Sequence, residues 1–217
     1  AGVAVVTGDT KVVERGKGDG IFITTTGVGV VPEGVRLAPD RARPGDRILV
    51  SGTLGDHGVA IMSKRENLSF ETEIVSDSAA LHTLVADMIE AVPDIHMMRD
   101  PTRGGVATVL NEIARESRVG MKIREDAVPI ATAVRGACEL LGLDPLYVAN
   151  EGKLVAFCDG DDAEALLSVM RAHLLGRNAA IIGEVIEDEH NFVQMETAFG
   201  GDRIIDWLAG EQLPRIC

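Results

Sequence analysis

The final residue of this sequence, Cys217, is a thiol that could do chemistry. Pro214 has a fixed φ near −65° and restricts the residue before it, which predicts an extended terminal arm. Arg215 lies close by, and its positive charge favours the reactive thiolate. Exposed free thiols are usually avoided in soluble proteins. The pattern therefore indicates a cysteine that enters another protein's active site and is modified there, although a frayed terminus without a role fits the same residues.

A second cluster consists of Thr7, Gly8, Asp9, Thr10 and Lys11. The Asp9 carboxylate is a suitable ligand for Mg²⁺, and the Lys11 ammonium is suited to phosphate oxygens. This combination of groups fits a magnesium–phosphate site at the end of a strand. An ordinary polar turn has the same composition, and the stretch alone favours that interpretation.

A third stretch consists of Asp100, Pro101, Thr102, Arg103, Gly104 and Gly105. It joins a predicted strand to a predicted helix, so Asp100 or Thr102 can cap that helix. Backbone N–H groups next to Arg103 would form an anion site. The glycines would let a ligand approach the backbone closely. The same glycines also permit tight packing of a helix against a sheet, and the pattern leaves both interpretations open.

Two further groups could act as bases. Glu151 precedes a predicted buried strand, and partial burial would raise its pKa towards neutrality, as a general base requires. On this stretch alone, the residues favour a solvated loop glutamate over a base. His57 lies in the glycine-rich stretch 52–58, but a histidine without an evident partner is more often structural.

The elements that must position these groups alternate between strands and helices. The clearest helix is Ser78–Val92, with an apolar stripe on one face and capping signals at Ser76, Asp77 or Ser78. Other helices are predicted at 59–64, from the 100–105 stretch through 114, at 131–141 and at 161–173, and strands at 47–51, 95–98, 121–124 and 153–158. Ile181–Ile186 is expected to pair with Phe192–Met195. The alternation predicts an α+β domain with helices covering a mixed sheet.

The N-terminal part has a different character. Strands are predicted at Val3–Val6 and Ile21–Val31, which are rich in β-branched residues. We interpret residues 1–40 as the last strands of an N-terminal domain whose larger part is absent. Residues 41–210 then form the main domain, and residues 211–217 form a flexible tail that carries Cys217.

The amino-acid composition argues against nucleic-acid-binding and membrane-bound classes of protein. A net charge of −13 argues against a nucleic-acid or acidic-membrane surface, where a basic patch is expected. No apolar run approaches the roughly 18 residues of a membrane-spanning helix. The three cysteines lack metal-ligand spacing, and Cys138 and Cys158 lie in apolar runs typical of buried positions. These features favour a reducing, cytoplasmic compartment.

Several stretches together resemble the HypE family of hydrogenase maturation factors, the carbamoyl dehydratases of nickel–iron hydrogenase assembly. They are VTGDTKVV (6–13), LVSGTLGDHG (49–58), RDPTRGG (99–105), VRGACELLGLD (134–144), ANEGKLV (149–155) and PRIC (214–217). The wider superfamily is similar to aminoimidazole ribonucleotide synthetase, thiamine-monophosphate kinase and selenophosphate synthetase. The glycine-rich turns do not separate these members, whereas the terminal cysteine motif does.

The resemblance implies a fold like the C-terminal domain of aminoimidazole ribonucleotide synthetase and an ATP-dependent dehydration. In this family the terminal cysteine is carbamoylated by the carbamoyltransferase HypF, and the carboxamide oxygen is then phosphorylated and eliminated to leave a thiocyanate. The cyano group passes to iron on the HypC–HypD scaffold, and the full-length family members form homodimers.

By position in the motifs, Cys217 carries the substrate, Lys11 and Glu151 are catalytic, and Asp9 binds Mg²⁺. The ATP-binding positions implied are Thr7, Gly8, Asp9, Thr10, Asp100, Thr102, Arg103, Gly104 and Gly105. The sequence lacks the hundred or so residues in which the family keeps most of its nucleotide site, since a complete ATP-binding domain needs roughly that length. The resemblance therefore covers the C-terminal portion of the family.

Three alternatives remain beside this hypothesis. The chain could serve only as a binding module that presents a modifiable cysteine to partners. It could also be an ATP-dependent kinase or synthetase acting on a free small molecule, which would leave the terminal motif unexplained. A thiol–disulfide protein is disfavoured because no Cys-x-x-Cys motif is present.

Overall fold

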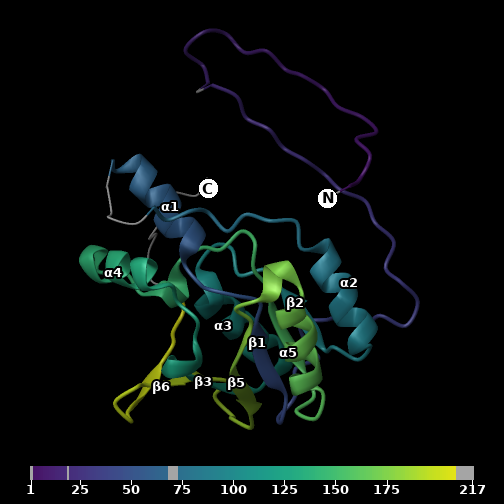
Figure 1. Ribbon diagram of the computed structural model, residues 1–217, viewed down its shortest axis with the longest axis vertical. Coiled ribbons are helices and arrows are strands. Elements are labelled where there is room, and N and C mark those ends of the chain that lie inside the picture. The colour runs from purple at the N-terminus through teal and green to yellow at the C-terminus, as the bar shows by residue number, and fades with distance from the viewer. Residues whose placement is uncertain (1, 19, 68–72, 209–217) are drawn as a thin grey trace. The chain divides into compact units, whose positions relative to one another are not determined.

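The computed structural model describes residues 2–18, 20–67 and 73–208 (Figure 1). The chain divides into two units, Ala1–Gly34 and Val35–Cys217. Every helix and strand of the described residues belongs to the second unit. None of these helices is both long and apolar enough to cross a lipid bilayer.

The second unit is built on one mixed sheet with the strand order β2-β4-β1-β5-β3-β6-β7. Its strands are β1 (Arg47–Val50), β2 (Met97–Arg99), β3 (Gly120–Arg124), β4 (Val155–Cys158), β5 (Ala180–Ile186), β6 (Val193–Glu196) and β7 (Asp202–Ile204). Strands β3 and β6 run parallel, whereas the other neighbours in the sheet are antiparallel. The predicted α+β architecture with a mixed sheet is therefore confirmed.

Helices cover both faces of this sheet. The helices of the described residues are α1 (Asp56–Arg65), α2 (His82–Ala91), α3 (Gly105–Ser117), α4 (Thr132–Leu141) and α5 (Ala163–Ala172), with short 3₁₀ turns η1 (Glu125–Ala127), η2 (Pro145–Tyr147) and η3 (Leu174–Gly176). Successive side chains of β1 alternate between the faces. Leu49 packs into the core under α2 and α5, which lie together in Figure 1, whereas Ile48 and Val50 pack into the core under α3.

A smaller apolar cluster joins α1 and α4. It contains Val59, Val134, Ala137, Cys138 and Val148, all of which are buried. Val148 directly precedes the Ala149–Lys153 stretch, so this cluster anchors one end of the loop that carries Glu151. The core thus fixes the position of that loop relative to α1.

Two predicted features of the second unit are wrong. The helix expected from Ser78 begins only at His82, and its N-terminus has no side-chain cap. Strands β5 and β6 do not form a hairpin, because β3 lies between them and pairs with both. A short connection favours a hairpin locally, but β3 supplies hydrogen-bond partners for both strands.

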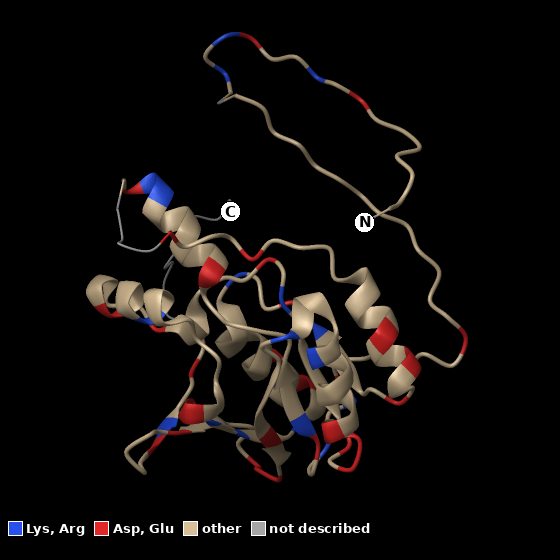
Figure 2. Cartoon of the chain, in the orientation of Figure 1, with Lys and Arg blue, Asp and Glu red and all other residues tan. Residues whose placement is uncertain are grey.

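The strands predicted in the first unit are also absent from its described residues. Val5 and Val28 are 92% and 99% exposed, so no apolar face is covered there. Figure 2 shows that most of this unit is uncharged. A β-strand needs a paired neighbour and a covered apolar face to be stable, and the described residues of this unit provide neither.

Candidate active site

One buried amide, the side chain of Asn150, connects three of the stretches that the sequence singled out. Its Oδ1 accepts the N–H of Gly55 at 2.8 Å, and its Nδ2 donates to the Pro101 carbonyl at 3.1 Å and to the Val148 carbonyl at 3.0 Å. Asn150 is 0% exposed. The structure therefore brings the 52–58 turn, the 100–105 turn and the Glu151 loop together at a single point.

The loop after Asn150 is held from its other side by Asp77. The Oδ1 atom of Asp77 accepts the N–H of Glu151 at 3.0 Å and the N–H of Gly152 at 3.3 Å. The sequence pattern predicted that Ser76, Asp77 or Ser78 would cap a helix, and this prediction is wrong. The Asp77 side chain instead accepts hydrogen bonds from a loop far away in the sequence, because α2 begins only at His82.

Lys153 adds a cation to this arrangement. Its Nζ lies 3.5 Å from Asp77 Oδ2, and the two side chains are 13% and 2% exposed. Asp56 lies within electrostatic range of both. Burial raises the pKa of Asp56, while a hydrogen bond from the Thr53 hydroxyl and the positive charge of Lys153 oppose this shift. The site thus holds two carboxylates around one ammonium group.

A hollow of about 400 Å³ opens beside these groups. It is lined by Ser51, Gly52, Thr53, Asp77, Ser78, Ala79, Gly152, Lys153, Leu174, Leu175, Arg177 and Asn178. Its lining combines hydroxyl, amide and charged side chains with the apolar Leu174 and Leu175 of η3. The hollow can therefore accept a polar group of moderate size.

Glu151 itself is exposed. The described residues therefore leave this side chain open to solvent rather than partly buried, as the sequence had allowed. Only the backbone of Glu151 is held, through its N–H bond to Asp77. Among the described residues, the carboxylate is accessible to an incoming group.

The 100–105 turn has a packing explanation. Its two glycines have φ of 73° and 61°, a backbone region that other residues rarely adopt. A Cβ at Gly105 would lie 2.4 Å from the Leu146 carbonyl of η2. Helix α3 has no side-chain cap, so the predicted capping by Asp100 or Thr102 is wrong. Asp100 and Arg103 are exposed, and Thr102 is half-buried.

His57 is a buried structural residue. Its Nδ1 lies 2.8 Å from the Ser76 hydroxyl, and its Nε2 is buried with no hydrogen-bond partner among the described residues. This contact ties α1 to the segment that contains Asp77. These contacts favour a structural role for His57, as its sequence context suggested, over a role as a general base.

The remaining predicted site residues lie elsewhere. Thr7, Gly8, Asp9, Thr10 and Lys11 are exposed in the first unit, where the Thr10 N–H donates to Asp9 Oδ1 at 2.8 Å. Cys217 and the rest of the tail from residue 209 lie outside the described residues. Among the described residues, no group of three or more His, Cys, Asp or Glu side chains is placed to hold a metal ion.

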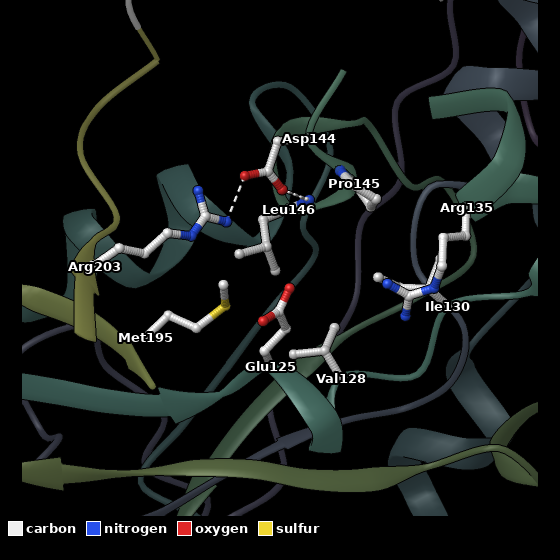
Figure 3. A pocket seen from close by; sticks show the side chains of 9 residues that line it. All are labelled: Glu125, Val128, Ile130, Arg135, Asp144, Pro145, Leu146, Met195 and Arg203. Atoms are coloured by element: carbon white, nitrogen blue, oxygen red, sulfur yellow. Dashed lines mark hydrogen bonds and ion pairs between the residues drawn. The ribbon is translucent and has the colours of Figure 1, made fainter. Parts of the chain in front are cut away.

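A second, smaller pocket lies under η2 and is drawn in Figure 3. Its volume is about 50 Å³, enough for a few water molecules. Arg203 on its rim pairs with Asp144 at 2.6 Å, and Asp144 also accepts the Leu146 N–H at 3.0 Å. Arg203 and Asp144 thus bind each other, and the size of the pocket excludes a nucleotide.

The sequence of the second unit matches a known family. Residues 43–196 match the family described as AIR synthase related protein, C-terminal domain. The chain belongs to the AIR synthase-related family. The matched span includes Asn150, Asp77 and every strand of the sheet except β7.

Individual AIR synthase-related proteins are similar to the chain over its whole length. The carbamoyl dehydratase HypE of Azotobacter vinelandii is 69% identical over 217 residues, and that of Escherichia coli K12 is 46% identical over 217 residues. The chain spans 64% of the length of each of these relatives. The resemblance to the HypE family predicted from the motifs is confirmed.

Solved structures of HypE proteins are similar to this chain in fold. A crystal structure of hydrogenase maturation protein HypE in complex with ATP has a TM-score of 0.79 and 50% identity, covering 83% of this chain and 55% of that one. A HypE–HypF complex has a TM-score of 0.78 and 46% identity, covering 81% and 57%. Thiamine-monophosphate kinase from Stenotrophomonas maltophilia K279a is more distant, with a TM-score of 0.51 and 25% identity over 74% of this chain and 52% of that one. The predicted fold relationship is therefore confirmed.

Proposed function

We propose that this chain is part of an ATP-dependent carbamoyl dehydratase that acts on a carbamoyl group carried by its own Cys217. The product is a protein thiocyanate, which supplies cyanide for the iron of nickel–iron hydrogenase. The observation that carries the proposal is the 69% identity to a carbamoyl dehydratase across all 217 residues, the span that ends in the Pro214–Cys217 motif.

The donor chemistry of residues 7–11 fits a magnesium–nucleotide group. Asp9 offers a carboxylate, Lys11 offers an ammonium group, and both are exposed. Asp9 would hold the Mg²⁺ ion that accompanies the nucleotide, since carboxylate oxygens are suitable ligands for Mg²⁺. When bound, ATP supplies the phosphoryl group that turns the carboxamide oxygen into a leaving group. Thr7, Gly8, Thr10 and the 100–105 turn complete the proposed nucleotide contacts.

The chain's own residues would handle the sulfur and the protons. The Cys217 sulfur carries the carbamoyl carbon throughout. Conversion of the carboxamide to a nitrile removes the oxygen and both nitrogen protons, so a base must lie near the nitrogen. Glu151 is the proposed base, because its carboxylate is exposed to an incoming tail while its backbone is held by Asp77. Lys11 would offset the negative charge of phosphate.

The proposed partners follow from the same chemistry. HypF would deliver the carbamoyl group, and the HypC–HypD scaffold would receive the cyano group, with the full-length protein acting as a homodimer in the cytoplasm. A solved HypE–HypF complex supports the first of these partners. The net charge of −13 disfavours nucleic acid and acidic membranes as partners.

Intact-protein mass spectrometry tests the proposal. The full-length protein is incubated with the carbamoyltransferase, carbamoyl phosphate and ATP. A carbamoyl adduct on Cys217 that then loses water is expected, and Cys217→Ala should abolish the adduct. Glu151→Gln should keep the adduct and block the loss of water. Thiocyanate formation at the wild-type rate in Glu151→Gln would remove Glu151 from the mechanism.

The same spectra distinguish the alternative. An adduct that never loses water, in the wild-type protein with ATP present, would favour a binding module that only presents a modifiable cysteine. Absence of any adduct would contradict the proposed function.

A further inference from the structure

The Asp77 carboxylate lies directly beneath the loop that carries Glu151. Its side chain is 2% exposed, and its Oδ1 accepts two successive backbone N–H groups, those of Glu151 and Gly152. The two bonds measure 3.0 and 3.3 Å and converge on one oxygen atom, so they constrain two successive amides together. The peptide planes on both sides of Glu151 are therefore oriented by one side chain.

The second oxygen of Asp77 faces the ammonium group of Lys153. Oδ2 accepts no hydrogen bond within the described residues and lies 3.5 Å from Lys153 Nζ. An unpaired buried charge is strongly unfavourable, and the Lys153 ammonium compensates it. Because Lys153 belongs to the same loop, the ion pair and the two N–H bonds all join Asp77 to one short stretch.

Backbone packing strengthens this attachment. Gly152 is buried against the segment that contains Asp77, and a Cβ there would lie 1.7 Å from the Asp77 carbonyl oxygen and 2.8 Å from the Ala79 nitrogen. On the other side of Glu151, Asn150 is held by its hydrogen bonds to Pro101 and Gly55. The residues on both sides of Glu151 are fixed, and only its side chain extends into solvent.

We propose that Asp77 is the positioning residue of the Glu151 base, with Lys153 as its counterion. The inference rests on the proposed function and extends it, since it assigns a role to a residue outside the motifs of the sequence. Asp77 touches neither the carbamoyl group nor ATP in this scheme. It acts only by fixing the backbone from which the Glu151 carboxylate projects.

Hydrogen exchange tests the attachment without relying on activity. Peptides covering residues 149–154 are compared between the wild-type full-length protein, Asp77→Ala and Asp77→Asn. Loss of a hydrogen bond to a charged group corresponds to roughly ten- to a hundredfold faster amide exchange at Glu151 and Gly152. Asp77→Asn keeps an oxygen that can accept both N–H groups, so its exchange should lie closer to wild type.

Dehydration kinetics test the catalytic consequence. Asp77→Ala should keep the carbamoyl adduct and the KM for ATP but lower the rate of water loss, with partial rescue in Asp77→Asn. Asp188→Ala is the matched control, since Asp188 accepts the His190 N–H in a loop outside this site.

The exchange experiment and the kinetic experiment can each contradict the proposal. Unchanged exchange in Asp77→Ala, or a wild-type dehydration rate in that variant, would each overturn the proposal. Failure of the wild-type protein to dehydrate its adduct would instead refute the proposed function and the positioning role with it. Faster exchange in Asp77→Ala would then still show that Asp77 holds the loop.

Discussion

Replacing Gly152 with alanine should disrupt the contact between the Glu151 loop and the Asp77 segment. The added Cβ would lie 1.7 Å from a backbone oxygen, and real Cβ contacts are essentially never below 3.0 Å. The two backbones must therefore separate by about 1.3 Å, the difference between these distances. Such a shift would break the N–H bonds to Asp77 that now measure 3.0 and 3.3 Å.

The magnitude follows from two contributions. Overpacking of a filled site costs about 1–3 kcal/mol, and the loss of a hydrogen bond to a charged group costs about 1.5–3 kcal/mol. We expect Gly152→Ala to lower the free energy of unfolding by about 4 kcal/mol. For a unit of this size that corresponds to a decrease in Tm of roughly 10 °C.

Gly136→Ala is the matched control. Gly136 lies inside α4, and a Cβ there would meet nothing within 4 Å. Alanine is a better helix former, so this variant should gain about 0.5–1 kcal/mol. Both changes restrict the unfolded chain alike, and their difference isolates the clash. Urea unfolding followed by circular dichroism measures both, and a Gly152→Ala protein within about 1 kcal/mol of wild type would refute the reasoning.

Other predictions concern buried polar groups and thiols. Asn150→Ala should lower the free energy of unfolding in urea by about 3 kcal/mol, because it leaves the partners of a 0% exposed side chain unsatisfied. A loss below about 1 kcal/mol would show that water replaces the amide. Asp46→Ala should cost about 3–5 kcal/mol, since Asp46 is 1% exposed and bonds His96 Nδ1 at 2.7 Å; an unchanged urea midpoint would contradict this. Burial raises the pKa of Cys138 to about 11 and that of Cys158 to about 12 from 9.0. The stability this provides is complete below pH 9 and is lost as the pH rises towards 11–12, so urea midpoints should fall there less steeply in Cys138→Ala/Cys158→Ala.

Much of the second unit could be predicted from local patterns. Helices α3, α4 and α5 and strand β4 were predicted from short stretches of neighbouring residues, and the structure forms these elements close to the predicted bounds. The chemistry of the Glu151 loop was also visible, because a carboxylate, a glycine and a lysine follow one another in the chain. Local sequence patterns therefore predicted most helices and strands of the second unit. They also pointed to the Glu151 loop, but not to the Asp77 side chain that holds it.

The tertiary structure decided which elements meet. Strand β3 separates β5 from β6, although their short connection predicts a hairpin. Asp77 holds a residue 74 positions away, and no local pattern distinguishes it from a helix cap. Strand pairing and buried hydrogen bonds depend on partners brought together by packing of the whole core, whereas periodicity reflects only adjacent residues. The loop of Glu151 was therefore evident in the sequence, and the group that holds it in place emerged only from the fold.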